Sequence, residues 1–504
     1  MNAVVLPVLL PLLTAVGLLL WGRPSPARRM LAAGSAAAQL GLAMGLVVRL
    51  AEGGWFILPV GRWAVPYGIV LSIDLLAALM LTLSGLTSLA CLIYGFFELP
   101  VRWEHPLRLP LVQFLVMGIN LAFITGDLFN LFVAFEVMLI SSYALLTLEA
   151  DNWDIKQAYP YIAVNLVGSA LFLAAAGLVY ALTGTLNYSE LAQVTAGMSS
   201  DPRLLAVVLL LMVVFALKAG VFPLYHWLPN SYPTLPLPLA ALYAGMLTKV
   251  GIYVIFRMLT TVLPHDLAFV HGLLAWMAGL TMLLGVLGAI SRNYVRGILS
   301  FHILSQVGFM ILAIGLFTPL SLAAAVVYIV HHIVVKSSLF LLSGIVLVLN
   351  KTDDLDRGAN LWRVTPWVGV LFLAQAMSLA GLPPLSGFWG KYLILVAGLE
   401  LKEYVLVAVS LVASVLTLFS MLKIWLGPFW REDESVTVQV NDSRWRPMAA
   451  VVTGLTVISL MIGFGVEGVF RLAQQATATA MDQPGYALAV QKTLAEVKAK
   501  GLNP

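Results

Sequence analysis

Long apolar runs recur along almost the whole chain, and they restrict its possible folds more than any other feature. A helix that crosses a bilayer needs about 20 mostly apolar residues. Runs of this kind lie near residues 3–21, 31–51, 70–96, 109–125, 129–149, 159–182, 204–222, 238–262, 268–290, 298–317, 320–350, 366–400, 403–426 and 448–470. Only 10% of the 504 residues are charged, whereas soluble domains carry roughly a quarter. The sequence therefore predicts an all-α polytopic membrane protein with about 14 transmembrane helices.

The first apolar run and the single cysteine exclude several classes of protein. The run from Val4 to Trp21 is too long for the core of a signal peptide and has no small-residue cleavage site, so we expect a retained helix. Because Cys91 is the only cysteine, an internal disulfide, a thiolate zinc site and a c-type haem are excluded. The loops carry no phosphate-binding, nucleophile-elbow or metal-binding motif, and none is long enough for a catalytic domain. We therefore expect a transporter rather than an enzyme, without cofactor or metal.

Basic residues in the loops predict the orientation of the chain. One set of alternate loops holds Arg23, Arg28, Arg29, Arg102, Arg108, Lys156, Arg292, Arg296, Lys351, Arg357, Arg363, Arg431, Arg444 and Arg446. The other set holds little more than Arg62, Arg203, Arg257 and Lys402. Lys and Arg accumulate in cytoplasmic loops, so the first set is predicted in the cytoplasm and both termini on the outer face of the cell membrane. The net charge of +4 then reflects membrane topology, and no nucleic-acid partner is expected.

Three segments outside the apolar runs have patterns of their own. The segment from Gly53 to Gly68 predicts a small hairpin at the outer surface. The alternation in SVTVQV, within Arg431 to Arg446, predicts a short strand. The tail from about Ala487 to Lys500 predicts an amphipathic helix lying on the membrane or on a partner.

Ionisable side chains inside the apolar runs are the main functional evidence in the sequence. An ionised group in the bilayer core is costly, so such groups usually face a cavity or one another. The set comprises Asp74, Glu136, Lys218, Lys249, His302, His331, His332, Lys336, Lys391 and Lys423. Basic groups outnumber carboxylates, and Glu136 is the only carboxylate at mid-span depth in the central region. This excess favours sites that lose their protons during a cycle, and a purely structural scaffold of charges is the alternative.

Helical spacing predicts which histidine belongs to a relay. His332 and Lys336 are four residues apart and share a helix face, whereas His331 points roughly 100° away. A neutral histidine beside a lysine can pass a proton directly or through one water. His302 and the paired histidines could instead bind haem b, but a lysine on the face of His332 disfavours that alternative.

Prolines interrupt two of the predicted spans at corresponding places. Lys218 lies just before Pro223, and Lys391 lies just after Pro383 and Pro384. Broken helices at membrane depth are tolerated where protein or water satisfies the free backbone groups. The interrupted spans are the seventh and the twelfth, so two units of opposite topology are expected, as in transporters with inverted repeats.

Several stretches resemble a known family. They are GDLFNLFVAFEVMLISSYALLTLE (126–149), FALKAGVFPLYHWLPNSYP (215–233), GMLTKVGIY (245–253), HIVVKSSLF (332–340) and LAGLPPLSGFWGKY (379–392). The sequence resembles the proton-translocating antiporter-like subunits shared by respiratory complex I and the Mrp-type cation/proton antiporters. The first stretch, the length and the paired histidines are most similar to the D-type subunits of Mrp antiporters.

The resemblance implies a division of the chain. Its family has two inverted five-helix units, spans 4–8 and 9–13, with broken helices seven and twelve. This implies a three-helix segment at 1–108, a first unit at 109–262 and a second unit at 263–426. A cytoplasmic loop, the last transmembrane helix and the tail would follow at 427–504.

The resemblance also implies roles for individual side chains. Glu136 would be the acidic partner of Lys218, and Lys249 would be the central lysine of the eighth span. His332 and Lys336 would form a relay in the eleventh span.

At the far end of this path, Lys391 would be the terminal lysine of the twelfth span, and His302 is a further candidate. Asp74, His226 and His331 are candidate uptake or accessory residues.

Together these observations predict a proton-translocating subunit of a hetero-oligomeric antiporter for Na+ or another monovalent cation. The partners would be other membrane subunits, the lipid bilayer, protons and the cation. The alternative is a proton-pumping subunit of a complex I-like or hydrogenase-linked redox complex.

Overall fold

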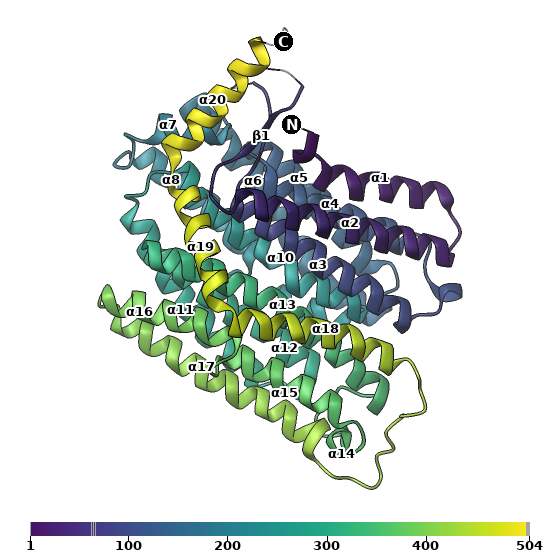
Figure 1. The fold of residues 1–504 in the computed structure, drawn as a ribbon. Helices are drawn as coiled ribbons and strands as arrows, with labels where there is room; N and C mark the ends of the chain where they lie inside the picture. The colour runs from purple at the N-terminus through teal and green to yellow at the C-terminus, as the bar shows by residue number, and fades with distance from the viewer. Residues whose placement is uncertain (1, 62, 64, 66, 500–504) are drawn as a thin grey trace.

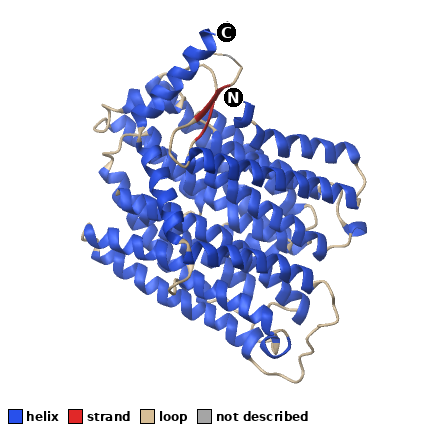
Figure 2. Cartoon of the chain, viewed as in Figure 1, coloured by secondary structure: helices blue, strands red, loops and turns tan. Residues whose placement is uncertain are grey.

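The computed structural model describes residues 2–61, 63, 65 and 67–499. Its long helices run side by side, and one two-stranded sheet lies near the N-terminus (Figures 1 and 2). In the described part of the chain, 11 helices are long and apolar enough to cross a membrane. Three shorter apolar helices, α1 (Leu6–Trp21), α4 (Arg108–Ile124) and α15 (Pro366–Ala380), match the remaining apolar runs. The predicted all-α polytopic architecture is confirmed.

The first segment contains α1, which follows η1 (Asn2–Val4), and then α2 (Pro26–Leu50), α3 (Leu75–Glu98) and η2 (Val101–Trp103). The strands β1 (Phe56–Pro59) and β2 (Val70–Ile73) pair antiparallel, with Phe56 opposite Ile73. The predicted hairpin therefore exists, but its second strand lies just beyond Gly68, in a stretch that we predicted to begin the third span. Arg62, which the sequence analysis places in an outer loop, lies outside the described residues.

The next part of the chain contains α10 (Leu237–Arg257), a helix that is buried along its whole length. Its elements are α4, α5 (Leu128–Thr147), α6 (Asn152–Thr183), α7 (Tyr188–Thr195), α8 (Pro202–Ala219), α9 (Leu228–Ser231), η3 (Tyr232–Thr234), α10 and the π-helical turn η4 (Met258–Val262). Every residue of α10 is buried, because α3, α4, α8, α12 and α13 all pack on it. Side-chain caps fix the helix starts, as where Asp127 accepts from the Asn130 amide at the start of α5.

The following part repeats the pattern of long helices. It comprises α11 (Ala268–Ile290), α12 (Val295–Leu316), α13 (Pro319–Asn350), α14 (Leu361–Val364), α15, α16 (Ser386–Glu400), α17 (Tyr404–Ile424) and η5 (Trp425–Trp430). The 32-residue helix α13 packs against α10, α12, α15 and α16. It therefore joins the two central parts of the bundle.

Both predicted helix interruptions are present, and they have the same local geometry. Helix α8 ends at Gly220 with φ 76°, and α15 ends at Gly381 with φ 92°. These left-handed conformations suit glycine, and each glycine amide donates to carbonyls of the preceding turn. The chain then turns through a proline-containing segment before the helix resumes.

The C-terminal part departs from the predictions in two places. The last apolar run is divided at Gly465 into α18 (Trp445–Phe464) and α19 (Val466–Met481), and α19 leads across the bundle into α20 (Gln483–Ala499) (Figure 1). The predicted tail helix is confirmed as far as Ala499, while Lys500 lies outside the described residues. Its face with Tyr486 and Val490 is buried, since α20 packs on α7 and β1 of the same chain, and contact of the rest of this helix with a membrane or a partner stays a prediction.

The predicted strand in SVTVQV is also wrong, since residues 435–440 form no strand. Their backbone groups bond to isolated partners instead of to a neighbouring strand, some in other elements and some nearby, as where the Val440 amide donates to the Val438 carbonyl. Asn360 Nδ2 donates to the carbonyls of Asp433 and Val436 at 2.7 and 3.2 Å, and the Gln439 amide donates to the Leu349 carbonyl. Alternation alone does not supply a partner strand.

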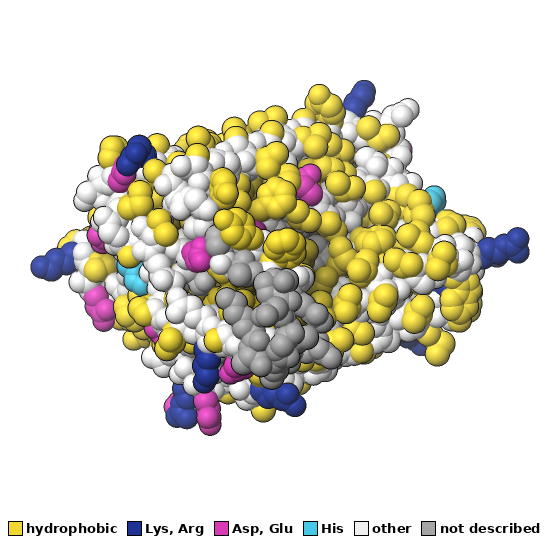
Figure 3. Space-filling model, turned by 90° about the horizontal axis from the view of Figure 1, so that it is seen from above, with side chains coloured by type: hydrophobic (Ala, Val, Ile, Leu, Met, Phe, Trp, Pro, Cys, Tyr) yellow, Lys and Arg dark blue, Asp and Glu magenta, His cyan; other side chains and the backbone are white. Residues whose placement is uncertain are grey.

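The outer surface agrees with a lipid environment. Seen from above the view of Figure 1, hydrophobic side chains are spread over much of the face, most densely toward its right side, and Lys and Arg side chains lie mainly at its margins (Figure 3). Large exposed apolar side chains include Leu20, Met30, Val48, Val415 and Phe464. This composition is typical of a membrane-embedded surface.

Candidate functional site

The predicted ionisable residues lie on six helices of the bundle. Glu136 is on α5, Lys218 on α8, Lys249 on α10, His302 on α12, the cluster His331, His332 and Lys336 on α13, and Lys391 on α16. Lys249, the three histidines and Lys336 are 0% exposed, and Lys218 and Lys391 are 4% exposed. Glu136 alone is only partly buried. The helices thus bury seven basic side chains within the bundle.

Lys218 is held in the last turn of α8 by weak contacts with α6. Its Nζ donates to the Asn165 carbonyl at 3.3 Å and to Ser169 Oγ at 3.4 Å. Nζ also lies 5.9 Å from the centroid of the Phe135 ring. These long contacts leave the amine free to exchange partners.

Glu136 lies close enough to act electrostatically on Lys218, but the two side chains form no ion pair in the described part of the chain. Glu136 Oε1 has no hydrogen-bond partner among the described residues. The structure therefore shows this pair in an open arrangement.

Lys249 lies at the centre of the bundle without a carboxylate partner among the residues that the structure describes. Its Nζ donates to the Ala244 carbonyl at 2.5 Å and to Thr248 Oγ1 at 3.2 Å. Helix α10 packs closely against its neighbours at two glycines. A Cβ on Gly245 would clash with Ser337 of α13, and a Cβ on Gly251 would lie 3.0 Å from the carbonyl carbon of Lys218 on α8.

His332 and Lys336 are buried polar groups without hydrogen bonds. Neither ring nitrogen of His332 nor Lys336 Nζ has a partner among the described residues. The Nζ lies 5.8 Å from the Phe340 ring centroid, and Lys249 acts on both side chains electrostatically. A buried amine without a partner is unfavourable when charged, so this position favours a group that releases its proton.

Lys391 lies at the second helix interruption. Its Nζ donates to the carbonyls of Leu379 and Ala380, at 3.1 and 3.0 Å, in the last turn of α15. These carbonyls form the negative end of the α15 dipole, which favours a cation. Nζ also lies 4.6 Å from the centroid of Phe309 on α12.

His302 and the α13 residues connect Lys249 with Lys391. His302 Nε2 is 2.6 Å from Ser420 Oγ, and both Lys336 and Lys391 act on the His302 ring electrostatically. His332 is in turn within electrostatic reach of Lys249, Lys336 and Lys391. The predicted residues from α10, α12, α13 and α16 are thus brought together in one buried cluster.

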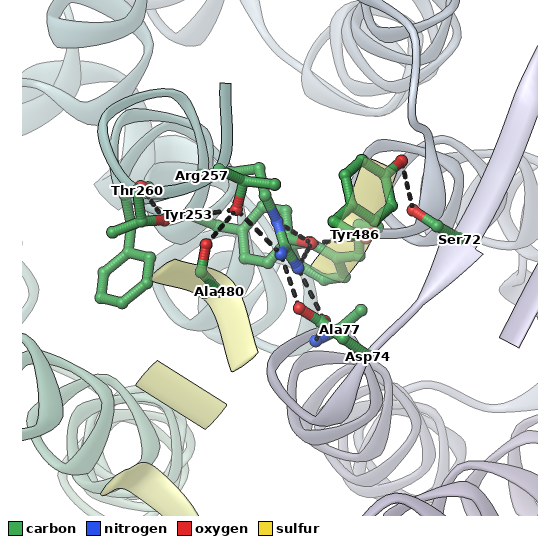
Figure 4. A network of polar contacts seen from close by, with 11 residues as sticks. Ser72, Asp74, Ala77, Tyr253, Arg257, Thr260, Ala480 and Tyr486 are labelled. Atoms are coloured by element: carbon green, nitrogen blue, oxygen red, sulfur yellow. Dashed lines mark hydrogen bonds and ion pairs between the residues drawn. The ribbon is translucent and has the colours of Figure 1, made fainter. Parts of the chain in front are cut away.

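Two of the predicted accessory residues lie apart from this cluster. His226 is exposed, in the turn that follows α8. Asp74 is 2% exposed and forms a two-pronged ion pair with Arg257, with distances of 2.6 and 2.7 Å (Figure 4). Arg257 was predicted in an outer loop, but it belongs to α10 and is buried, because Asp74 compensates its charge. Asp74 therefore has a structural partner and does not face the cluster.

Uncharged polar residues also contact the buried cluster, and they were not predicted from the sequence. His331 Nδ1 is 2.7 Å from Ser386 Oγ, and the Tyr328 hydroxyl donates to Gln306 Oε1. Serine, glutamine and tyrosine occur in many membrane helices for packing reasons. Their spacing in the sequence therefore gave no signal that separated these from structural residues.

Known proteins share both the sequence and the fold of this chain. The profile of a family described as NADH:quinone oxidoreductase/Mrp antiporter transmembrane region matches residues 125–417. The D-type subunit of the Na+/H+ antiporter of Alkalihalophilus pseudofirmus is 39% identical over 491 residues, covering 97% of this chain and 99% of the relative. The corresponding protein of Bacillus subtilis is 36% identical over 492 residues, with the same coverage of 97% and 99%.

A solved structure agrees with these relatives. A chain of the Mrp complex from Dietzia sp. DQ12-45-1b superposes with a TM-score of 0.89 at 31% sequence identity. The match covers 97% of this chain and 99% of that chain. The similarity therefore extends over the whole bundle.

Proposed function

Because this chain belongs to the NADH:quinone oxidoreductase/Mrp antiporter family, and within it to the D-type subunits of Mrp Na+/H+ antiporters, we propose that it moves protons through the membrane. The proposed path comprises Glu136, Lys218, Lys249, His302, His332, Lys336 and Lys391. The protons would be exchanged for Na+ or another monovalent cation, within a complex of several membrane subunits. The single observation that carries this proposal is the buried row of amines and imidazoles without carboxylate partners among the described residues.

The chemistry of these groups suits proton transfer. Lysine and histidine can be neutral or charged, and burial disfavours the charged form. Unpartnered nitrogens on His332 and Lys336 leave lone pairs and N–H groups available to a neighbour or to a bridging water. A charge moving through 100 mV gains about 2.3 kcal/mol, which is enough to change the proton occupancy of such a site more than tenfold.

The pair Glu136 and Lys218 would act as the switch of the path. In the open arrangement the Lys218 amine has only weak polar contacts. If Glu136 approached, the carboxylate would stabilise the charged amine. Because α8 contacts α10 at Gly251, a change at Lys218 would reach the helix that carries Lys249.

The two helix interruptions support an origin from two inverted units, at 109–262 and 263–426. The motif Ala-Gly-x-x-Pro ends α8 at residues 219–223 and ends α15 at residues 380–384. Each interruption holds a buried lysine, before the break in α8 and after it in α16. Inverted repeats with interrupted helices place transport sites near the midplane of the membrane.

The proposed location is the cell membrane, with both termini on the outer face. The distribution of Lys and Arg between alternate loops supports this orientation. A redox-linked pump would use the same kind of path, and it would require an electron donor for activity. The relatives at 36–39% identity favour the antiporter.

Substitution of Lys218 tests this function. We expect Lys218→Ala and Glu136→Ala to abolish Na+-dependent dissipation of a pH gradient in everted vesicles while the complex stays assembled. Lys218→Arg should also be inactive, because arginine keeps its positive charge and does not release a proton.

Lys218→Arg separates proton transfer from a structural role. If only the positive charge were needed to hold the helices together, arginine would preserve activity. The double variant Glu136→Gln with Lys218→Met is the matched control, since it removes both charges at once. Full activity of Lys218→Arg or of the double variant would refute the proposed role.

A further inference from the structure

A group of buried hydroxyl and amide side chains lies between α15, α16 and α18, apart from the proposed path. Its members are Ser378 and Gln375 on α15, Ser386 on α16, and Ser459, Thr456 and Thr453 on α18. We name this group the α15–α18 ladder. Its five innermost members are 0–5% exposed, and Thr453 is half-buried.

Ser386 connects the ladder to His331. Its Oγ is 2.7 Å from His331 Nδ1, 2.8 Å from Ser378 Oγ and 3.2 Å from Ser459 Oγ. One hydroxyl therefore bridges α13, α15 and α18 at the first residue after the interruption. Lys391, on the same helix as Ser386, acts electrostatically on the His331 ring.

Two glycines allow this close meeting of helices. A Cβ on Gly387 would lie 2.8 Å from His331 Nε2, and one on Gly463 would lie 2.8 Å from the Ser386 amide nitrogen. His331 and α18 can thus reach the start of α16 only because both positions lack a side chain. The arrangement brings the hydroxyls together instead of separating them with apolar groups.

The three serines differ from most serines of membrane helices. Such serines commonly donate to a carbonyl of their own helix, as Ser410 does to the Leu406 carbonyl at 2.8 Å. Among the described residues, Ser378, Ser386 and Ser459 have only one another and His331 as side-chain partners. Their hydroxyls are therefore free to accept a proton on one side and donate one on the other.

The ladder continues from Ser386 to the membrane face at which α15 and α18 begin. One turn along both helices, Gln375 Nε2 donates to Thr456 Oγ1 at 3.0 Å, and Gln375 Oε1 has no partner among the described residues. No direct hydrogen bond joins this pair to the serines among those residues, so a water would have to bridge the step. The hydroxyls of Thr456 and Thr453 also donate to carbonyls of their own helix, at 2.9 and 2.8 Å, and would have to rotate to pass a proton. One further turn along α18, Thr453 Oγ1 accepts from the indole of Trp367 at 3.2 Å. Trp367 is 53% exposed, as expected for tryptophan at a membrane interface.

From this geometry we propose that the α15–α18 ladder is a second proton route, which links His331 and Lys391 with the face where α15 and α18 begin. Hydroxyl and amide groups would pass protons with bridging waters, and none of them needs to hold a charge in the apolar interior. The loop charges predict that this face is cytoplasmic. The route rests on the proposed role of Lys391 as a proton site, and it gives His331 a function that His332 does not share.

The test replaces ladder side chains without changing their shape. Thr456→Val and Ser386→Ala remove one hydroxyl each, and Thr417→Val on α17 is the control. Thr417 is 0% exposed and Thr456 is 5% exposed, and each hydroxyl donates to a carbonyl of its own helix. They differ in that Thr456 Oγ1 also accepts from Gln375, whereas Thr417 has no side-chain partner among the described residues. In everted vesicles each ladder variant should lose about tenfold in maximal antiport rate. This is the change in rate expected when the activation free energy rises by the contribution of one hydrogen bond.

The dependence of the antiport rate on Na+ concentration separates a role in proton transfer from a structural role. Ladder variants should keep the KM for Na+ and lower the maximal rate per assembled complex, while Thr417→Val keeps both. Full maximal rates for both Ser386→Ala and Thr456→Val would refute the proposal that the ladder carries protons. Lys391→Met is measured in parallel: if it is inactive while both ladder variants are fully active, only the ladder is refuted, and if it is active, the proposed path itself fails.

Thiol labelling tests whether the ladder is hydrated, and it does so even if a variant transports poorly. Cys91 is buried and is the only cysteine, so Cys91→Ser provides a clean background. In this background, Thr456→Cys should react with a small methanethiosulfonate reagent added to the complex in vesicles, and Thr417→Cys should not. Equal labelling at the two positions, or no reaction at Thr456→Cys, overturns a hydrated route along the ladder.

Discussion

At the scale of single residues, the buried lysines differ in how well their amines are bonded. Lys391 donates to two free carbonyls at the end of α15, and Lys249 donates to one carbonyl and one hydroxyl. Lys336 has no hydrogen-bond partner in the described part of the chain. A chain selected for stability alone would not keep such a group, because an unsatisfied buried polar group costs free energy. Lys336 is therefore the residue at which stability and transport are most clearly opposed.

Replacing Lys336 with methionine should separate these two properties. Methionine has a similar length and no polar group, so Lys336→Met should stabilise the complex against heat by about 1–2 kcal/mol. The same variant should lose antiport, since its side chain carries no proton. The measurement pairs thermal unfolding of the purified complex with transport in vesicles. A destabilised complex that still transports would show that Lys336 is structural.

At the scale of secondary-structure elements, the two interrupted helices determine where the lysines lie. Each interruption begins with a glycine in the left-handed region, which ends the helix and turns the chain. The freed carbonyls of α15 then bind Lys391. The position of this amine thus follows from the end of a helix rather than from an ion pair.

Alanine at Gly381 tests this dependence on backbone conformation. With φ 92°, an alanine is strained, and its Cβ would lie 2.9 Å from Lys391 Cδ. We expect Gly381→Ala to destabilise the protein by about 1–3 kcal/mol and to reduce transport by displacing Lys391. The control is Gly177→Ala in α6, where a Cβ meets nothing within 4 Å, and which should be stabilising by about 0.5–1 kcal/mol. Equal melting temperatures for the two variants would contradict this account.

At the scale of the whole molecule, one buried network joins distant parts of the chain. Asp74 at the start of α3 binds Arg257 of α10, and Arg257 also donates to the Tyr253 hydroxyl at 2.8 Å. Nearby, Thr261 donates to the Ala480 carbonyl of α19, and the Tyr486 hydroxyl of α20 donates to Ser72 at 3.3 Å (Figure 4). The first segment, the central helix and the tail therefore meet at one place.

Breaking the ion pair should loosen this junction. Asp74→Asn leaves the Arg257 charge buried without a carboxylate, so we expect a loss of about 3–5 kcal/mol in stability. The double variant Asp74→Leu with Arg257→Met removes both charges and should be less damaged than Asp74→Asn. Thermal unfolding of the purified complex provides the comparison. A double variant less stable than Asp74→Asn would show that hydrogen bonds, not charge burial, dominate the junction.

Much of the architecture could be predicted from the sequence because it depends on local composition. Apolar runs long enough to cross a bilayer must form helices there, since lipid satisfies no backbone groups. The interruptions could be predicted for the same reason, because Pro223, Pro383 and Pro384 cannot continue a helix. The buried lysines and histidines were identifiable as candidates because charged side chains are rare in such runs.

Only the tertiary structure decided how these parts meet. Whether Asp74 faces the buried cluster or Arg257 depends on contacts between residues 183 positions apart, and no local pattern encodes them. The strand expected in SVTVQV required a partner strand, which packing did not provide. The close approach of His331 and α18 to Ser386 depends on two glycines, Gly387 beside Ser386 on α16 and Gly463 on α18. The sequence by itself thus determined which segments enter the membrane and which side chains are costly there, while packing in three dimensions determined which of those side chains have partners.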